Sequence, residues 1–435
     1  MRQTARIATE SSLAARHRTG GIVRKIRRVL PSVTVPHGVK VLLVGISVYA
    51  LTTFLVFGGA FVGWDRMRPD GLQLGEGQLG DRFVDMLCQW DGQSYSRIAL
   101  DGYAFERGRA SSVAFFPLYP LLGRTVGKLT GMSSQIALLV ISHVCLILSL
   151  MLFLEYGRLR MDAGVGRSGW HAVVLLAVFP VGLFMRVAYT ESLFLFLCLL
   201  ALYGMERRWC GVGIAVIIGL ATAARPPGVA LLVPLMIHVW TRRGSACQAV
   251  ASLSYLLPIA CGGLFAYMLY LWCAFGEPLG FAQAQQHIRM MPRVGLWEHT
   301  LILVSGEPLW SPYWPSSVGN WSRFDTSAWL SLQFANPVYF VAAAFLLYLG
   351  TFRRWLTALE ASFGATLLLV GYVTRSYDMC MASQARFVLV IFPIYIVMER
   401  LLVQCPIGAR IGVVLLFALY LFAYSVMWGA GRLVI

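Results

Sequence analysis

Stretches of about 20 predominantly apolar residues recur along this chain, and they restrict its fold more than any other feature. Each is long enough to cross the roughly 30 Å hydrocarbon core of a bilayer as an α-helix. Hydrophobic residues make up 58% of the chain and charged residues only 13%, far from the composition of a soluble domain. Because a spanning segment must satisfy its backbone internally, we expect an all-α, polytopic membrane protein.

The apolar stretches predict a bundle of about eleven spans, broken by two long outer regions. The spans are expected at about residues 40–63, 134–156, 170–185, 191–205, 212–224, 228–240, 253–275, 328–350, 359–373, 387–402 and 411–428. The first outer region, 64–133, has room for two amphipathic helices lying on the membrane. The second covers residues 276–326. We expect two parts, a basic tail over 1–38 and a single membrane domain over 39–435.

Positive charge predicts the orientation. The chain has 36 Lys and Arg against 20 Asp and Glu, but the excess gathers in the tail and in three pairs after apolar stretches. These pairs are Arg207-Arg208, Arg242-Arg243 and Arg353-Arg354. This is the positive-inside pattern, so no nucleic-acid partner is expected. The N-terminus should be cytoplasmic and both outer regions outside, in a bacterial plasma membrane or, in a eukaryote, in the endoplasmic reticulum.

One carboxylate stands out in the first outer region. Asp91 lies in the stretch Gln-Trp-Asp-Gly-Gln-Ser-Tyr, directly after the aromatic Trp90. If residues 81–100 form one helix, Asp91 shares a face with apolar residues one and two turns away. Asp81 and Asp85 would then point to water. A solvated acid on an interfacial helix is the other interpretation of the spacing.

Arginines near membrane depth are the next candidates, because buried charge is costly in a membrane. Arg225 precedes a Pro-Pro pair between two short spans, and Arg386 precedes the tenth span. Both are expected on the side that holds Asp91, where a guanidinium group could bind phosphate. Arg186 and Arg375 are instead expected to reach the interface or to pair with acids.

No set of His, Asp, Glu or Cys has the spacing of a metal site, so no metal is expected. His143 and His171 are expected to be core or interface residues, whereas His287 in the second outer region could contact a substrate. The nine cysteines show no CxxC pair. Cys88 and Cys380 fall outside the expected spans, and whether they pair is open.

Several motifs, in chain order, resemble the PIG-V-type mannosyltransferases. This family adds the second mannose in GPI-anchor assembly and has bacterial relatives. The matching residues are Trp90–Tyr95 with Ile98-Ala99 and Gly102-Tyr103, Ala114–Pro120, Tyr189–Phe194, Ala224–Gly228, Phe275–Phe281 with Ala284-Gln285, and Gln384–Phe387 followed by Phe392-Pro393. The combined motif of the first outer region is the most specific.

The resemblance implies a GT-C-type membrane glycosyltransferase that takes a sugar, expected to be mannose, from a polyprenyl-phosphate donor outside the cell or in the lumen. It implies an inverting reaction with Asp91 as general base and with Arg225 and Arg386 at the donor phosphate. It also implies acceptor or sugar contacts from Trp90, Tyr95, Glu106, Tyr119, Glu191, Gln285 and His287. The donor is a co-substrate and no cofactor is expected; the acceptor is a lipid or glycan, and the need for a partner subunit is open.

Two features depart from the family pattern. Gln286, His287 and Ile288 follow Ala284-Gln285, where the family tends to carry an aromatic residue, and Glu106 alone represents an acidic and aromatic stretch. Both departures concern the acceptor more than the reaction. The alternative function is a lipid or sugar transporter or flippase, which also has many spans and intramembrane arginines. The long aromatic outer regions and the absence of a repeat between the halves argue against it.

Overall fold

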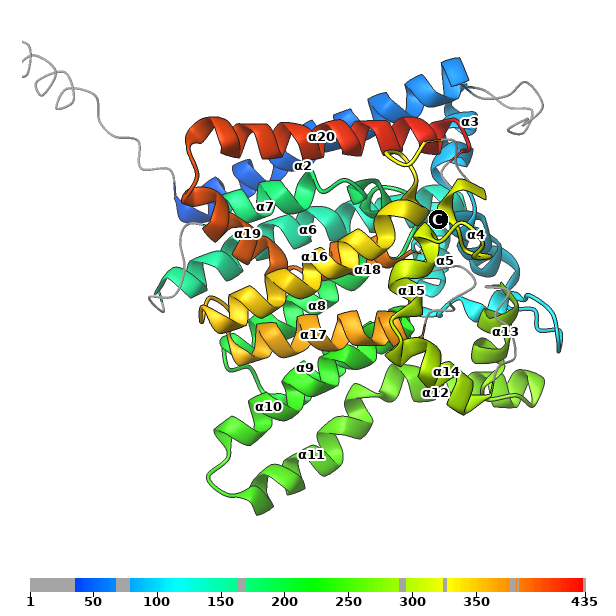
Figure 1. The fold of residues 1–435 in the computed structure, drawn as a ribbon. Helices are drawn as coiled ribbons and strands as arrows, with labels where there is room; N and C mark the ends of the chain where they lie inside the picture. Colours follow the sequence, from blue (N-terminus) through cyan, green and yellow to red (C-terminus); the bar gives the residue numbers. More distant parts are fainter. Residues whose placement is uncertain are drawn as a thin grey trace, which may run out of the picture. The chain divides into compact units, whose positions relative to one another are not determined.

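The computed structural model describes residues 36–67, 79–162, 169–288, 295–323, 327–374, 381 and 383–432. These residues form helices, turns and irregular segments without a β-strand, which confirms the all-α class (Figure 1). Of the described residues, those before Val44 belong to one unit and those from Val44 on to a second, which holds the contacts of the candidate site. Arg375 and Cys380 lie outside the described residues. The tail boundary at residue 38 stays a prediction.

Four helices among the described residues are each long and apolar enough to cross a bilayer alone. They are α2 (His37–Met67), α6 (Ser134–Asp162), α16 (Leu332–Phe352) and α20 (Ile407–Gly429). A further pair, α11 (Ala246–Ala260) and α12 (Gly262–Phe275), is bent by 49° and makes a fifth if it acts as one span. These helices coincide with five predicted spans and have the character of a multi-pass membrane protein. The count of eleven spans stays a prediction.

The other six predicted spans are shorter or interrupted. Three are single helices of 14 to 16 residues, namely α8 (Glu191–Glu206), α9 (Gly211–Ala224) and α17 (Ala358–Val373). Three are broken near proline, namely α7 (Trp170–Ala177) with η2 (Gly182–Met185), η3 (Pro226–Leu231) with α10 (Leu232–Arg242), and α18 (Gln384–Val390) with α19 (Pro393–Val403). A break exposes backbone polar groups at membrane depth, so these sites need protein or water as partners.

The two outer regions consist of short helices. The first holds α3 (Leu79–Leu87), α4 (Asp91–Asp101), η1 (Ser112–Ala114) and α5 (Leu118–Thr130). The second holds α13 (Gly280–Ile288), α14 (Leu296–Val304), α15 (Glu307–Trp310), η4 (Ser311–Tyr313) and η5 (Trp321–Arg323). An apolar cluster that includes Val113, Phe116 and Ala284 joins η1 to α12 and α13. The Tyr267 hydroxyl adds a 2.7 Å hydrogen bond to the Val113 carbonyl.

Residues 81–100 do not form one helix, because the chain turns sharply between α3 and α4. Trp90 has a φ of +52°, which an α-helix cannot accommodate. The Met86 carbonyl, at the end of α3, accepts hydrogen bonds from Gln89 Nε2 at 2.8 Å and Trp428 Nε1 at 2.9 Å. The Leu87 carbonyl accepts from the Ala188 amide at 3.1 Å. Tertiary contacts therefore replace the helical bonds that would have continued α3.

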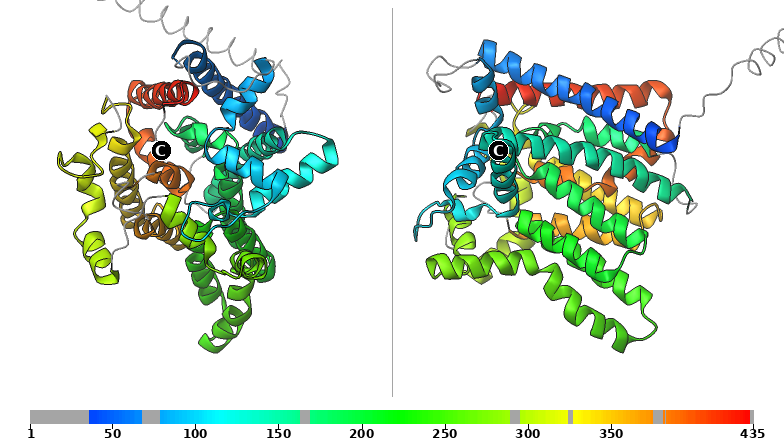
Figure 2. Two further views of the ribbon diagram at one scale, coloured as in Figure 1. Left: turned by 90° about the vertical axis from the view of Figure 1, so that its right-hand side faces the viewer. Right: turned by 180° about the vertical axis from the view of Figure 1, so that it is seen from behind.

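Helices α2 and α20 approach each other closely and run side by side (Figures 1 and 2). A Cβ atom built on Gly63 would lie 1.9 Å from the Val426 carbonyl oxygen, and one on Gly429 would lie 1.9 Å from that of Ala60. Only glycine leaves room for such an approach. The pairing fixes the end of α20, and with it Trp428, beside the turn that precedes Asp91.

The bundle has two chemically different ends. Ser96 of α4 shares a 2.6 Å hydrogen bond with Ser134 at the start of α6, so the end that carries Asp91 is also where α6 begins. The arginine pairs follow the far ends of α8, α10 and α16. Since α8 begins at Glu191 beside Asp91, Arg207 and Arg208 lie at the other end. Which end faces the cytoplasm stays a prediction.

Candidate active site

Asp91 is the first residue of α4, and the turn before it sets the direction of its side chain. Gly92 packs against Ala188, where an added Cβ would lie 3.4 Å from the alanine Cβ. The Asp91 side chain is 34% exposed, and its Oδ2 lies 3.1 Å from Nη1 of Arg386. Half of the sequence expectation therefore holds: the carboxylate faces protein, although it does so from a helix start and not from a helix face.

Glu191, the first residue of α8, is the centre of a charge cluster. Its side chain is fully buried, and its Oε1 lies 2.6 Å from Nε of Arg386 and 2.7 Å from Nη1 of Arg225. The two arginines predicted to share a site thus meet at one oxygen atom. We call Asp91, Glu191, Arg225 and Arg386 the Asp91 cluster. With two acids and two arginines, its formal charge is zero.

Helix ends account for the position of every member of the cluster. Asp91 and Glu191 stand at the N-termini of α4 and α8, where the helix dipole favours negative charge. Arg225 is the C-cap of α9, and the helix dipole stabilises a positive charge at a C-terminus. Arg386 lies in the first turn of α18, where the dipole opposes a cation. Its two carboxylate partners therefore offset both burial and the unfavourable dipole.

Aromatic rings surround the two guanidinium groups. Arg386 lies over the Tyr189 ring at 4.7 Å and the Phe184 ring at 5.1 Å. Arg225 lies over the Phe387 ring at 5.5 Å. Cation–π contacts of this kind gain strength where water is excluded. The rings thus hold both guanidinium planes in fixed orientations.

The Asp91 cluster is not saturated with hydrogen bonds. Glu191 Oε2 and the Tyr189 hydroxyl are buried and have no hydrogen-bond partner among the described residues. A buried polar atom without a partner costs about 1–3 kcal/mol. Such atoms beside paired charges indicate a site that a polar ligand or water completes.

Two of the predicted contact residues lie beside the cluster. Trp90 is 40% exposed and meets Trp428 edge to face at 4.6 Å. Tyr95, on α4, is buried between Phe115 and Tyr119, at 5.1 and 5.2 Å. Burial raises the pKa of Tyr95, and the charge of Asp91 raises it further. The Tyr95 hydroxyl therefore keeps its proton and can serve as a hydrogen-bond donor.

Of the other predicted contact residues, Glu191 belongs to the cluster and the remaining four lie elsewhere. Tyr119 is fully buried and bonds the Leu138 carbonyl and Ser142, so its hydroxyl already has partners. Gln285 donates to the Ala114 carbonyl at 2.8 Å, which holds α13 to η1. Glu106 is exposed and pairs with Arg109 at 3.0 Å. Among the described residues, none of these three, nor the half-buried His287, bonds to the Asp91 cluster.

Arg186 departs from its sequence expectation. It is fully buried, so it does not reach the interface, and it forms no ion pair with an acid among the described residues. Its guanidinium donates to Thr52 at 2.5 Å and Thr53 at 3.2 Å, and to the Gly182 carbonyl at 2.8 Å. It therefore ties α2 to the turn around η2. His143 accords with its expectation, with Nδ1 3.0 Å from the Tyr49 hydroxyl in the core.

Sequence reasoning missed the supporting aromatic residues. Phe184, Tyr189 and Trp428 contact the cluster or the turn before Asp91, although none was a candidate. Tyr189 directly precedes the Thr-Glu-Ser motif, so its position was a usable signal. Nothing local marks Trp428, since the residues that its indole contacts, such as Met86 and Tyr189, lie more than 200 residues earlier in the chain.

Comparison with known sequences identifies relatives for part of the chain. The family described as Mannosyltransferase (PIG-V) matches residues 76–273. GPI alpha-1,6-mannosyltransferase 2 of Cricetulus griseus is 30% identical over 181 residues, which cover 39% of this chain and 34% of the relative. The Homo sapiens protein of that name is 29% identical over 237 residues, or 51% and 43% of the two chains. GPI mannosyltransferase 2 of Drosophila melanogaster is 26% identical over 228 residues, or 48% and 49%. The matches thus span about a third to a half of these relatives.

Solved structures give a weaker likeness. The apo oligosaccharyltransferase of Archaeoglobus fulgidus has 14% identity and a TM-score of 0.43, over 89% of this chain and 56% of that chain. The same organism's archaeal oligosaccharyltransferase, in complex with an inhibitory peptide and a dolichol-phosphate, has 13% identity and a TM-score of 0.42, over 89% and 55%. The sequence matches carry more weight: over residues 76–273, which include three of the four residues of the Asp91 cluster, the resemblance to the PIG-V mannosyltransferases is confirmed.

Proposed function

We propose that this protein is a membrane mannosyltransferase that transfers mannose from a polyprenyl-phosphate donor to a hydroxyl group of a lipid-linked or glycan acceptor. The observation that carries the proposal is the Asp91 cluster. Asp91 is a partly exposed carboxylate, the kind of group that accepts a proton. It pairs with Arg386, and Glu191 links Arg386 to Arg225, so two guanidinium groups of the kind that binds phosphate lie beside it. The family resemblance over residues 76–273 supports the sugar and the reaction.

In the proposed reaction, Asp91 takes the proton from the acceptor hydroxyl. The hydroxyl oxygen attacks the anomeric carbon of the donor, and the bond from that carbon to the phosphate oxygen breaks. The electron pair of this bond leaves with the polyprenyl phosphate, whose charge Arg386 and Arg225 stabilise. Attack opposite the leaving group inverts the anomeric carbon. We expect neither a metal nor a cofactor, since guanidinium groups can stabilise the departing phosphate.

The zero formal charge of the cluster suggests an order of events. A phosphate that approaches Arg386 competes with Asp91 for Nη1, which lies 3.1 Å from the carboxylate. Donor binding would then release Asp91, and its carboxylate would become available to the acceptor only when the donor is present. The buried Glu191 keeps its contacts with both arginines and acts as a positioning residue.

The test is turnover by the purified full chain with labelled polyprenyl-phosphate mannose and a glycolipid acceptor, measured as release of polyprenyl phosphate. Asp91→Asn should lower turnover by about 10² to 10⁴, the usual contribution of a general base. Donor binding should persist, because Asn removes a competitor for Arg386.

The matched control is Asp101→Asn, at the exposed far end of the same helix, which should leave turnover unchanged. Asp81→Asn and Asp85→Asn are further controls; Asp85 accepts a 2.8 Å hydrogen bond from Gln135. Normal turnover in Asp91→Asn would exclude the general-base role. Movement of donor across vesicles without release of polyprenyl phosphate would favour the transporter or flippase.

A second experiment tests on which side of the membrane the Asp91 cluster lies. We propose that the Asp91 end lies outside or in the lumen, because the arginine pairs gather at the other end. Single cysteines introduced at Arg109 and at Arg353, both exposed, should react with an impermeant reagent from opposite sides of the membrane. Labelling of position 109 from the cytoplasmic side would contradict the proposed location.

A further inference from the structure

Helix α14, in the second outer region, turns its apolar side chains away from the protein. None of its nine residues is buried. The less exposed ones are His299, Ile302 and Leu303, which form the side that faces the protein. The most exposed ones lie on the rest of the helical wheel, and four of them are large and apolar: Leu296, Trp297, Leu301 and Val304, at 85%, 74%, 50% and 81%. A helix on the surface of a soluble protein has the reverse arrangement.

Two tryptophans extend this apolar side beyond α14. Trp310, at the end of α15, is 49% exposed, and its Nε1 donates to the carbonyl of Ser305, directly after α14, at 3.4 Å. Trp314, which follows η4, is 58% exposed, and its ring meets that of Trp310 edge to face at 6.2 Å. We call these two residues and the four of α14 the α14 surface. A soluble monomer seldom exposes so many large apolar side chains together, so this surface indicates a partner.

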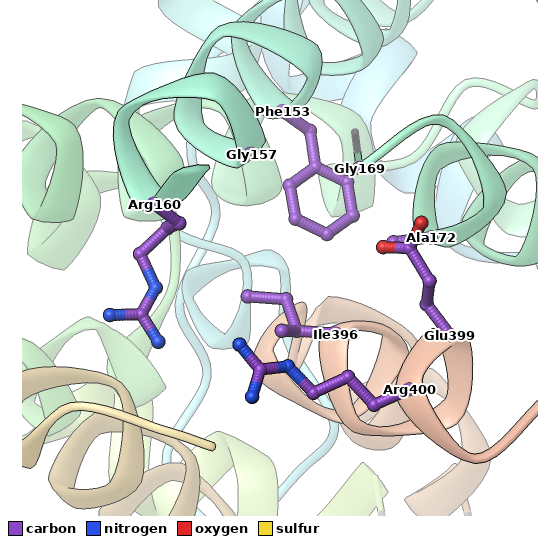
Figure 3. A pocket seen from close by; sticks show the side chains of 8 residues that line it. All are labelled: Phe153, Gly157, Arg160, Gly169, Ala172, Ile396, Glu399 and Arg400. Carbon is purple, nitrogen blue, oxygen red and sulfur yellow. The ribbon is translucent and has the colours of Figure 1, made fainter. Parts of the chain in front are cut away.

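Charged residues define the membrane surface at the end of the bundle opposite to the Asp91 cluster. The Arg353-Arg354 pair is exposed there, and exposed arginines belong outside the hydrocarbon core. Arg160 donates to the carbonyl of Trp355, the next residue, at 2.8 Å, and it lines one pocket with Arg400 and Glu399 (Figure 3). Arg160 lies 26 residues after the start of α6, a rise of about 39 Å, which exceeds the roughly 30 Å of the hydrocarbon core. The two ends of the bundle therefore belong to opposite membrane surfaces.

Two helices that start or end beside this arginine pair give the depth of the second outer region. Tyr372 lies 14 residues after the start of α17, a rise of about 21 Å, and its hydroxyl donates to the Leu303 carbonyl of α14 at 2.7 Å. Phe334 lies 18 residues before the end of α16, about 27 Å away, and its carbonyl accepts from the Tyr313 hydroxyl at 2.8 Å. Both rises are shorter than the roughly 30 Å hydrocarbon core, and any helix tilt shortens the depth further. The second outer region is therefore attached to α16 and α17 at the edge of that core.

We propose that the α14 surface lies in the membrane interface at the Asp91 end, where it contacts lipid headgroups and the upper acyl chains. Tryptophan favours this layer, because its ring is apolar and its N–H group can still bond to water or a headgroup. The surface also continues the outward apolar residues of the helices that hold it, such as Val338 of α16 and Leu369 of α17, at 54% and 59% exposure. An apolar face at this depth meets lipid and not bulk water. The inference does not depend on the proposed transferase activity.

The experiment introduces the photoreactive residue p-benzoylphenylalanine at single positions of the full chain in phosphatidylcholine nanodiscs, and mass spectrometry identifies what it cross-links. In place of Val304, on the α14 surface, it should form phospholipid adducts. The matched control is the same residue in place of Arg109, an exposed position in the first outer region. Position 304 should give about tenfold or more phospholipid adduct than position 109, since transfer of one large apolar side chain from water to lipid shifts the equilibrium by about that factor.

Leu301, three residues earlier on the same side of α14, provides a second position, and unfolding temperatures in the same nanodiscs show whether each variant is folded. Equal phospholipid adducts at the α14 positions and at position 109 would overturn the proposal. A cross-link from α14 to another part of the chain, or to a second copy of it, would also overturn it, because protein would then cover this face. Neither outcome involves turnover, so the proposed function is tested separately.

Discussion

Each end of the bundle holds a buried glutamate paired with arginine, and the two glutamates are satisfied in different ways. Glu360 accepts hydrogen bonds from the Tyr156 hydroxyl at 3.0 Å and from the Thr357 amide at 2.7 Å, and its Oε1 also lies 3.0 Å from Nε of Arg160 as an ion pair. Its two oxygens therefore both have partners. Glu191 places two arginines on one oxygen and leaves the other without a hydrogen bond.

The difference is that both carboxylate oxygens of Glu360 have partners within the fold, whereas one oxygen of Glu191 is left for the ligand that we propose. At Glu360, a capping box at the start of α17 supplies the backbone partner, so the local sequence completes the site. At Glu191 every partner comes from another helix, and the partners are themselves functional candidates. A buried network that is fully satisfied rigidifies a structure, whereas a partly satisfied one costs stability unless something else fills it.

Neutralising each glutamate should have the largest effect and tests whether the two buried glutamates have different roles. Glu191→Gln and Glu360→Gln both leave a buried arginine without its counter-charge, so each should lower the free energy of unfolding by about 3–5 kcal/mol. Turnover per folded molecule should fall only in Glu191→Gln. Unfolding in detergent and turnover corrected for folded protein give the two values. Equal turnover in both variants would remove the functional distinction.

Replacement of Arg386, compared with replacement of Arg160 at the other end, should have the next largest effect. Arg386 uses Nε for Glu191 and Nη1 for Asp91, so one lysine nitrogen cannot replace both contacts. Arg386→Lys should lower kcat/KM for the donor by about 10- to 100-fold, the effect of one or two lost charge-assisted bonds. Arg160→Lys, its counterpart near Glu360, should lower the unfolding temperature while kcat/KM stays near normal. A loss of turnover in Arg160→Lys would show that the two ends are coupled.

Much of the fold was predictable because it follows from apolar length. The four long helices α2, α6, α16 and α20 coincide with predicted spans, since about 20 apolar residues can hardly adopt another structure in a membrane. The interruptions around Pro180 and before Pro393 were not predicted, although proline marks them. Local sequence permits a kinked helix or a broken one, and neighbouring helices decide between them.

The composition of the candidate site was predictable, but its connections were not. Asp91, Arg225, Arg386 and Glu191 were all candidates from the sequence, and the fold brings them together. The central position of Glu191 could not be inferred, because Arg386 lies 195 residues away in the chain. The turn at Trp90 was missed for the same reason, since its hydrogen bonds come from α20 and from Ala188.

Replacement of Tyr156 and of Tyr189 should have the smallest effects, and the two variants should differ clearly in stability. Tyr156→Phe removes a hydrogen bond to a buried carboxylate and should cost about 1.5–3 kcal/mol of stability. Tyr189→Phe removes a hydroxyl without a partner, so stability should stay within about 0.5 kcal/mol of normal. If the Tyr189 hydroxyl meets the substrate, KM should rise although folding is unchanged. A stability loss in Tyr189→Phe equal to that of Tyr156→Phe would mean that the hydroxyl is already bonded in the resting protein.

The hydrogen bond from Trp428 to the Met86 carbonyl has a consequence for biosynthesis. Asp91 and the turn before it leave the ribosome early, yet the indole that completes this turn is made 342 residues after its acceptor. The helices that carry Glu191, Arg225 and Arg386 are synthesised in between. The hydrogen bond to the Met86 carbonyl therefore cannot form in the first outer region until α20 has been synthesised. Until then the turn lacks this hydrogen bond and depends on those that Gln89 and Ala188 supply.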